Sequence, residues 1–313
     1  MSRMEKNSKP FSVFSLLLLA GFLVSLSACR DANYEQSRDV NALQVTVSIL
    51  PQAYFVERIG GDALEVNVMV GPGEEAHTYE PSPEQMKTLS NSKIFFTIGV
   101  EYEENWIPRF QDINPDMAIV DSAGGIERLL ADENHTHESQ DSDEEDEQDT
   151  QHADPHVWLA PDNGKIIAKN ILIALSEVSP EMSETFNENY KQIIADIDAL
   201  DERIVSILKG SEKHKFMVFH PAWAYFAEQY QLEQISVQIG GQDPSAREMA
   251  ELIHIAQEQQ IQVIFVQRTF STADAEAIAM EIGAQVAVID PLARNWLENL
   301  ETVATTFAAA LTD

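Results

Sequence analysis

The sequence predicts an α/β protein made of two β/α lobes with mostly parallel sheets, joined by a long rigid helix. Short apolar strands alternate with helices twice along the chain, and such alternation is typical of parallel sheets. At 313 residues the chain exceeds the length at which a single hydrophobic core stops growing. A helical pattern of about 30 residues separates the two alternating runs, so we expect one lobe on each side of it.

The first alternating run contains four predicted strands. Residues 64–70 alternate apolar and other side chains, whereas 94–98 form a nearly continuous apolar run, as in a sheet covered on both faces. Ser82 and Gln85 form a capping-box pattern around Pro83, which predicts that a helix begins there. The strands are predicted at 44–50, 64–70, 93–98 and 117–120.

Two helices are predicted in the middle of the chain, at 162–178 and 180–209. The second begins with Ser179 as N-cap, followed by Pro180. Its apolar residues recur at spacings of three and four and form one buried stripe: Ile193, Ile197, Leu200, Ile204 and Ile207. At 1.5 Å per residue this helix would be roughly 45 Å long, which is longer than one small lobe. We therefore expect a stiff connector that belongs to both lobes.

The second alternating run contains strands at 216–219, 235–237, 263–266 and 285–289. Between them, Ser245 and Glu248 form another capping-box pattern, which predicts a helix start. The chain is thus divided into an N-terminal lobe at 44–179, a connecting helix at 180–210 and a C-terminal lobe at 211–313.

Residues 1–29 are predicted to be a lipoprotein signal peptide, followed by a polar tether at 30–43. Three basic residues precede the apolar stretch 11–24, which is short for a bilayer span but suits a signal peptide. The segment LSAC, ending at Cys29, resembles the lipobox of bacterial lipoproteins. This implies that Cys29, the only cysteine, is acylated and anchors the chain to a membrane; ordinary signal cleavage is the alternative.

The segment 131–154 interrupts the first lobe and is strongly acidic. It holds 11 acidic residues, no lysine or arginine, and three histidines: His135, His137 and His152. This composition predicts a disordered loop. The whole chain has 20 basic and 52 acidic residues, a net charge of −32. Phosphate recognition needs a basic patch, so we expect no nucleic acid partner.

Four segments far apart in the sequence each offer one residue that binds transition metals. These are His77 in GEEAHTYEPSP, His156 in DPHVWLAP, His220 in VFHPAWAYF and Asp290 in VIDPLARNW. Three neutral imidazoles and one carboxylate form a set that suits Zn²⁺. Three of the four directly follow predicted strands or their loops, where α/β folds bind ligands. Taken singly, each residue also has an ordinary alternative, as a solvated or structural histidine or a turn-forming aspartate.

The flanks of these residues resemble the ligand-bearing motifs of zinc- and manganese-binding receptor lipoproteins, the solute-binding components of bacterial ABC transporters. The resemblance covers nearly the whole chain after the tether. It implies a metal site between the lobes, with His77 and His156 from the first lobe and His220 and Asp290 from the second. Glu75 is an alternative ligand, since some zinc members complete the site with an acidic loop residue or water.

The resemblance also implies a function. The protein would be a high-affinity receptor that captures extracytoplasmic Zn²⁺ and delivers it to an ABC permease for import, as a membrane-anchored lipoprotein of the periplasm or the cell surface. In the family, histidine at position 220 goes with zinc, whereas manganese-type members tend to carry a carboxylate there. Zinc is therefore the expected cargo, with a manganese receptor of the same fold as the alternative.

Two further segments share the resemblance. The three histidines of the acidic loop match, in place and setting, a metal-capturing loop of zinc members, and would bind zinc weakly. A solvated acidic insert is the equally simple interpretation. The segment FVQRTFS departs from the family pattern at Gln267, where an acidic residue often stands.

A zinc-dependent hydrolase is the main alternative class, since three histidines plus water also describe a catalytic zinc site. Catalysis needs an open coordination position and a nearby general base, for which Glu75 is the one candidate. Asp290 as fourth ligand would close the coordination sphere, and no H-E-x-x-H signature occurs, so we expect no enzyme. An adhesive surface lipoprotein is a third class, although no separate adhesive module is present.

Overall fold

The computed structural model describes residues 42–131, 153–238, 242, 244–267 and 273–312. These residues belong to one contact unit, Asn41–Asp313. The predicted signal peptide with Cys29, most of the tether and the three loop histidines (His135, His137 and His152) lie outside the described residues. Within the described part of the chain, no helix has both the length and the apolar composition needed to cross a membrane.

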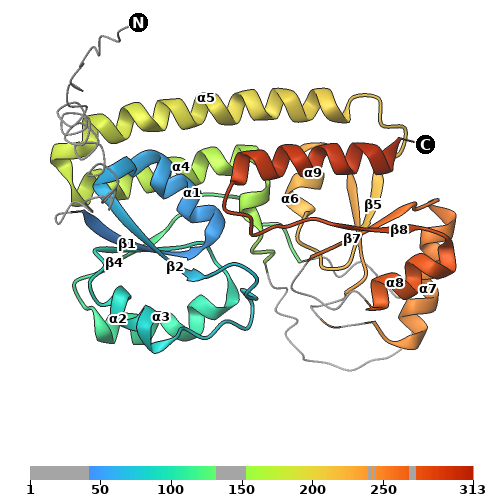
Figure 1. Ribbon diagram of the computed structural model, residues 1–313, viewed down its shortest axis with the longest axis horizontal. Coiled ribbons are helices and arrows are strands. Elements are labelled where there is room, and N and C mark those ends of the chain that lie inside the picture. Colours follow the sequence, from blue (N-terminus) through green and yellow to red (C-terminus); the bar gives the residue numbers. More distant parts are fainter. Residues whose placement is uncertain (1–41, 132–152, 239–241, 243, 268–272, 313) are drawn as a thin grey trace, which may run out of the picture. The chain divides into compact units, whose positions relative to one another are not determined.

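The first sheet is fully parallel, with strand order β2-β1-β3-β4. Its central strands β1 and β3 are buried on both faces, as the apolar run of β3 predicts. Helix α1 lies on one face and helices α2 and α3 lie on the other (Figure 1). The strands are β1 (Leu43–Ile49), β2 (Leu64–Val70), β3 (Ile94–Thr97) and β4 (Ala118–Asp121), and the helices are α1 (Leu50–Gly60), α2 (Pro83–Leu89) and α3 (Glu101–Ile113).

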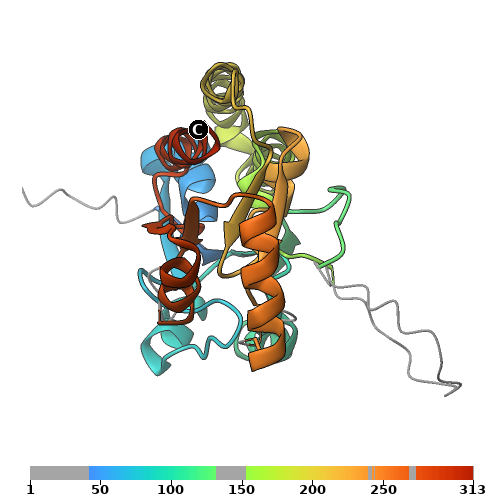
Figure 2. The same ribbon diagram turned by 90° about the vertical axis from the view of Figure 1, so that its right-hand side faces the viewer.

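The second sheet repeats this arrangement, with order β6-β5-β7-β8 and every pair parallel. Alternate residues of its inner strands enter two different cores: Phe216 and Phe265 face one, Met217 and Ile264 the other. Figure 2 views this half of the protein from its end. Its elements are β5 (Lys215–Val218), α6 (Ala224–Gln229), β6 (Glu233–Ser236), α7 (Ala246–Glu258), β7 (Val263–Val266), α8 (Ala273–Ile282), β8 (Gln285–Val288) and α9 (Trp296–Leu311).

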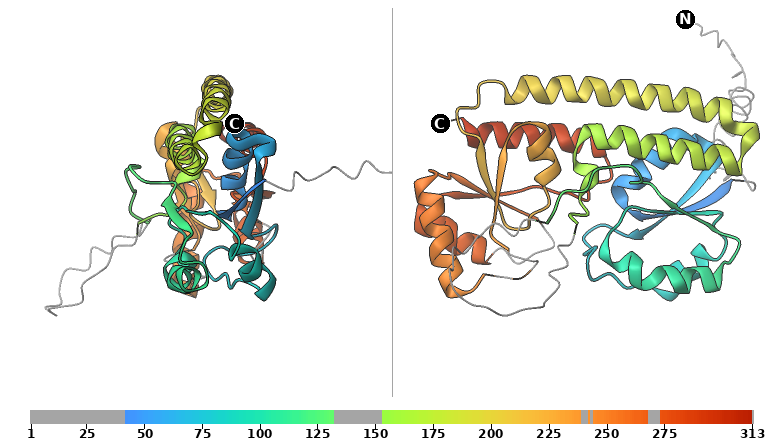
Figure 3. Two further views of the ribbon diagram at one scale, coloured as in Figure 1. Left: turned by 90° about the vertical axis from the view of Figure 1, so that its left-hand side faces the viewer. Right: turned by 180° about the vertical axis from the view of Figure 1, so that it is seen from behind.

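Helix α5 (Ser183–Leu208) connects the two halves. It lies against α1 and α4 (Pro161–Val178) of the first half and against α9 of the second. Figures 1 and 3 show α5 running past both halves, with α4 and α9 beneath it. The predicted stripe faces inward, since Ile193, Ile197, Leu200 and Ile204 are fully buried. The expectation of one long helix shared by both halves is confirmed.

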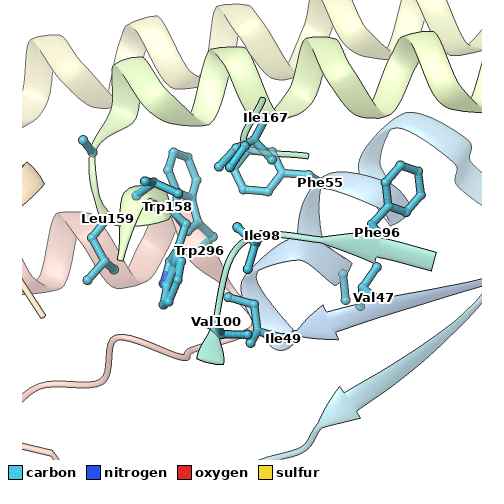
Figure 4. Packing of buried hydrophobic residues seen from close by; sticks show 14 of the residues in the cluster. Val47, Ile49, Phe55, Phe96, Ile98, Val100, Trp158, Leu159, Ile167 and Trp296 are labelled. Carbon is cyan, nitrogen blue, oxygen red and sulfur yellow. The ribbon is translucent and has the colours of Figure 1, made fainter. Parts of the chain in front are cut away.

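The main hydrophobic core is continuous from one half to the other. Trp296, the first residue of α9, packs against Phe55 of α1 with ring centroids 4.8 Å apart, and its Nε1 donates to the carbonyl of Trp158 (Figure 4). At the other end of α9, Phe307 stacks on Phe216 at 4.3 Å. Gly164 of α4 permits the close approach, because a Cβ there would lie 2.7 Å from the Trp296 ring. Helix α9 therefore ties both halves to one core.

The eight predicted strands and the capping boxes at Ser82 and Ser245 are confirmed, with strand ends displaced by one or two residues. One helix start was wrong. Ser179 makes no capping bond; a short 3₁₀ turn, Pro180–Met182, comes first, and α5 begins at Ser183. The lobe boundaries at 179/180 and 210/211 stay a prediction.

Candidate metal centre

Three histidines from separate parts of the chain converge. His77 lies in the loop between β2 and α2, His156 precedes the short 3₁₀ turn Val157–Leu159, and His220 follows β5. The Nε2 atoms of His77 and His220 are 3.2 Å apart, and those of His220 and His156 are 3.4 Å apart. All three ligand atoms lie within 4.8 Å of one another. Two nitrogens bound to one tetrahedral zinc at about 2.0–2.1 Å would be about 3.3 Å apart, so the 3.2 and 3.4 Å spacings fit such an ion.

Each imidazole is held from behind by an oxygen. The Nδ1 atoms of His77, His156 and His220 lie 2.6, 2.7 and 3.0 Å from side-chain oxygens of Glu101, Asp154 and Gln238, respectively. These acceptors assign the ring hydrogen to Nδ1 and leave the lone pair on Nε2. A hydrogen bond to the rear nitrogen is the usual device that fixes the tautomer and orientation of a metal-binding histidine. All three rings thus present a lone pair to the same point.

The pKa values of His77 and His220 are shifted in opposite directions. Burial, reinforced by the neighbouring His156 and His77, lowers the pKa of His220 to about 3. Burial would also lower the pKa of His77, but the hydrogen bond and charge of Glu101 raise it above its ordinary value. Without a metal, the extra proton therefore belongs on His77, whose Nε2–H can donate to the Nε2 lone pair of His220. A cation at this point replaces that proton.

The loop that carries His77 is fastened at both of its ends. Tyr79 is buried against Tyr102, with ring centroids 5.2 Å apart, and its hydroxyl donates to Oε1 of Gln85. Gln85 also completes the capping box of α2 and donates through Nε2 to the carbonyl of Met69 at the end of β2. The residue that marks the helix start in the sequence therefore also positions the histidine loop.

The segment of His156 is fastened by the second half of the protein. Asp154 accepts hydrogen bonds from both the backbone N–H and the ring of His156, and its own carbonyl accepts one from the hydroxyl of Tyr225 on α6. Two residues beyond the histidine, Nε1 of Trp158 donates to the carbonyl of Pro291 after β8. His156 is thus positioned by contacts between the halves as well as by its own loop.

The two predicted oxygen ligands, Glu75 and Asp290, differ in their position relative to the pocket. Glu75 lines the same pocket as the three histidines, and its Oε1 is 3.7 Å from Nε2 of His77 while accepting the backbone N–H of that residue. Asp290 is exposed and does not belong to the group of convergent ligand atoms; its carboxylate accepts the N–H of Leu292. Its neighbours Pro291 and Leu292 line the pocket. The structure brings the three histidines together and places Glu75 in the lining of their pocket, but neither Glu75 nor Asp290 belongs to the group of convergent ligand atoms.

Sequence reasoning missed the oxygens behind the rings. Asp154 stands in the quoted motif of His156, and its acidic side chain two residues before the ligand was a usable signal. Glu101 begins α3, where a carboxylate is favoured by the helix N-terminus, but nothing local links it to His77. Gln238 follows β6 and carried no signal at all. The outcome is a centre able to hold one four-coordinate metal ion through three nitrogens.

Comparisons with known proteins agree with this chemistry. The family model described as zinc-uptake complex component A, periplasmic (ZnuA) matches residues 45–310. The high-affinity zinc uptake system protein ZnuA of Bacillus subtilis is 30% identical over 284 residues, with 88% of each chain covered. The zinc-binding lipoprotein AdcA of Streptococcus pneumoniae is 28% identical over 288 residues; the match covers 91% of this chain but 55% of AdcA.

Solved structures give the same result. A crystal structure of ZnuA aligns with a TM-score of 0.78 at 39% identity, covering 87% of this chain and 100% of that one. A ZnuA deletion mutant with zinc bound aligns with a TM-score of 0.79, also at 39% identity, covering 87% of this chain and 99% of the mutant. The fold described above is therefore the fold of these proteins.

Proposed function

Because the chain belongs to the family described as zinc-uptake complex component A, periplasmic, we propose that it captures zinc outside the cytoplasm and delivers the ion to an ABC permease for import. The observation that carries this function is the convergence of three Nε2 lone pairs, each ring being held by an oxygen at Nδ1. The protein binds and releases its cargo without changing it. The hydrolase alternative is set aside, since the family supplies a transport component.

We assign the ligand roles as follows. His77, His156 and His220 bind zinc through Nε2, and an oxygen completes the coordination sphere. Glu75 lines the pocket and is one protein source of that oxygen; Asp290 could bind the ion after its bond to Leu292 opens, and water is the third source. Ligands from both halves then hold a single ion, so that zinc binding can alter how the halves meet.

The donor set favours zinc over manganese. Imidazole nitrogen suits Zn²⁺, whereas Mn²⁺ is better served by carboxylate and water oxygens. Burial lowers the pKa of His220 to about 3, so this ring is neutral and able to bind a metal at any physiological pH. A site with three neutral nitrogens and one oxygen gives manganese too few oxygen ligands.

Competitive zinc and manganese titrations of the purified mature protein, with residues 132–152 deleted, test the proposal. We expect one tightly held zinc per chain and much weaker manganese binding. His220→Ala should remove most of the zinc affinity while the circular dichroism spectrum is unchanged. His254→Ala is the matched control, because His254 is exposed on α7 and pairs only with Glu258 among the described residues. Tight manganese binding with weak zinc binding would show that zinc is not the preferred ion. Unchanged zinc affinity in His220→Ala would show that the binding site is assigned to the wrong residues.

The membrane anchor is a separate part of the proposal. Acylation at Cys29 would keep the receptor at the membrane that holds its permease, and the sequence ending at Cys29 supports this. In cell fractionation, the wild type should sediment with membranes and Cys29→Ser should appear in the soluble fraction. A variant that still sediments with membranes would show that the anchor lies elsewhere.

A further inference from the structure

The second sheet ends in a row of polar side chains beside the metal centre. The N–H of Phe219 donates to the carbonyl of Phe265 at 2.8 Å, and the N–H of Ile289 donates to the carbonyl of Val266 at 2.9 Å. The end of β7 is therefore flanked by the ends of β5 and β8. In sheet order, the chain reaches Gln238, His220, Gln267 and Asp290 within one or two residues of the ends of the four strands. Gln267 consequently stands between a histidine of the centre and the aspartate of the neighbouring turn.

Gln267 is buried, with 7% of its surface exposed, and it lines the same pocket as His77, His156 and His220. Its Nε2 has no hydrogen-bond partner among the described residues. Gln238, at the other side of His220, uses its amide oxygen to hold the ring of that histidine. A buried amide N–H without an acceptor destabilises the folded chain, and native structures keep few of them. A donor left unpaired at a metal centre indicates that its acceptor arrives with the ion.

We propose that Gln267 donates a hydrogen bond from Nε2 to the oxygen that completes the coordination sphere of the bound metal. This inference rests on the proposed zinc site. An amide nitrogen has no lone pair for a metal, so Gln267 acts as a positioning residue and not as a ligand. The oxygen belongs to water, to Glu75 or to Asp290; an N–H donor serves all three, because each oxygen keeps a lone pair after binding the metal. The histidines cannot accept this bond, since their Nε2 lone pairs are used by the metal.

The test is Gln267→Met, which keeps the size and burial of the side chain and removes its donor. Loss of a hydrogen bond to a metal-bound group typically lowers metal affinity by about 10–100-fold. We expect a loss of this size in competitive zinc titration, with one zinc per chain retained. The melting temperature of the metal-free protein should equal or exceed that of the wild type, since an unpaired buried donor has been removed. Gln257→Met, on the exposed face of α7, is the matched control.

Double-mutant cycles identify the oxygen. If it belongs to Glu75, the losses caused by Gln267→Met and Glu75→Gln are not additive, and the same holds for Asp290→Asn if that carboxylate is the ligand. If the oxygen is water, Gln267→Met is additive with both. In that case Gln267→Met should also raise the pH at which the visible spectrum of the cobalt-substituted protein changes. The reason is that the variant lacks the donor that stabilises metal-bound hydroxide.

Two results would overturn the inference: unchanged zinc affinity in Gln267→Met, or a lower affinity accompanied by a lower melting temperature of the metal-free variant. The second would make Gln267 an ordinary packing residue. A wild-type protein that binds no zinc tightly would overturn the proposed function and this inference together, so the two failures are distinguishable.

Discussion

At the scale of single residues, the centre depends on where one proton resides. His220 remains neutral because burial and the two neighbouring imidazoles lower its pKa to about 3. His77 is the opposite case, since Glu101 overcomes the effect of burial and raises its pKa. The Glu101 carboxyl responds in the reverse direction: burial would raise its pKa, but the bond to His77 lowers it. Zinc therefore competes with a proton on His77 and with none on His220.

This distribution predicts a shallow pH dependence of zinc affinity. Below the raised pKa of His77 the affinity should fall as pH falls, by about 10-fold per pH unit for the one proton on that ring. Three competing imidazoles would give about 1,000-fold per unit. Competitive zinc titration between pH 5 and pH 8 in the variant lacking 132–152 measures the slope. A thousandfold dependence would show that His220 is protonated in the metal-free protein.

The sequence predicted a centre of three histidines, with Asp290 as fourth ligand and Glu75 as its alternative, because the flanking motifs of these residues are local. It could not predict the geometry behind them. Glu101 and Gln238 reach their histidines only because α3 begins, and β6 ends, at the same edge of the fold. The position of Asp290 also depends on its turn: the side chain bonds to Leu292, a contact that a sequence motif does not distinguish from metal binding.

At the scale of elements, the start of α3 carries a buried carboxyl as well as Glu101. Glu103 is 3% exposed and accepts hydrogen bonds from the N–H groups of Ile98 and Gly99, and from the hydroxyl of Ser48. Burial raises its pKa to about 7 in spite of these bonds. The carboxyl thus fastens the β3–α3 loop that leads directly into Glu101 and borders the metal pocket at Val100.

The raised pKa of Glu103 predicts a definite change of stability with pH. Its pKa is near 4.5 in the unfolded chain and about 7 in the folded one, so the folded state holds an extra proton between these values. Its contribution to stability is therefore lost as pH rises through this window. Urea unfolding of the metal-free wild type and of Glu103→Gln should show the wild type losing about 2–3 kcal/mol relative to the variant between pH 5 and pH 8. If the difference in unfolding free energy between the wild type and Glu103→Gln does not change with pH, the pKa of Glu103 is not raised in the folded protein.

Local signals predicted the elements well but not every boundary. The capping boxes at Ser82 and Ser245 are confirmed, because both bonds of the motif lie within four residues. Strand β1 ends at Ile49, one residue early, because α1 begins at Leu50: Pro51 lies in its first turn, and the Gln52 side chain accepts the N–H of Ile49. Ser179 failed as a cap because Pro180 opens a 3₁₀ turn before α5.

At the scale of the whole described unit, the two halves share one core. Helix α9 inserts Trp296 beside Phe55 in the first half and Phe307 beside Phe216 in the second. Helix α5 runs past both. Large opening of the halves would break these contacts, so binding should tilt or reorder the loops around the centre and leave the helices in place.

The shared core predicts that the metal-free protein unfolds in one cooperative transition. Tryptophan fluorescence and circular dichroism should report the same urea midpoint. Trp296→Ala should lower the unfolding free energy by about 3–5 kcal/mol through the lost packing. Val205→Ala, which removes an exposed side chain of α5, is the control and should have little effect. Separate transitions for the two halves of the wild type would contradict a continuous core.

The sequence predicted the two parallel sheets and the long helix, since each has its own apolar periodicity. It did not predict the role of α9. Trp296 and Phe307 lie 11 positions apart on one helix, and their partners stand far away in the sequence, so only the tertiary arrangement shows that they join two halves.

Zinc K-edge X-ray absorption on the zinc-loaded mature protein lacking 132–152 tests the central claim most directly. The deletion removes His135, His137 and His152, so these three histidines cannot supply imidazoles to the ion. We predict three imidazole nitrogens and one oxygen at about 2.0–2.1 Å in a four-coordinate shell. A shell of six oxygens, or one containing a single imidazole, would contradict a site built from His77, His156 and His220.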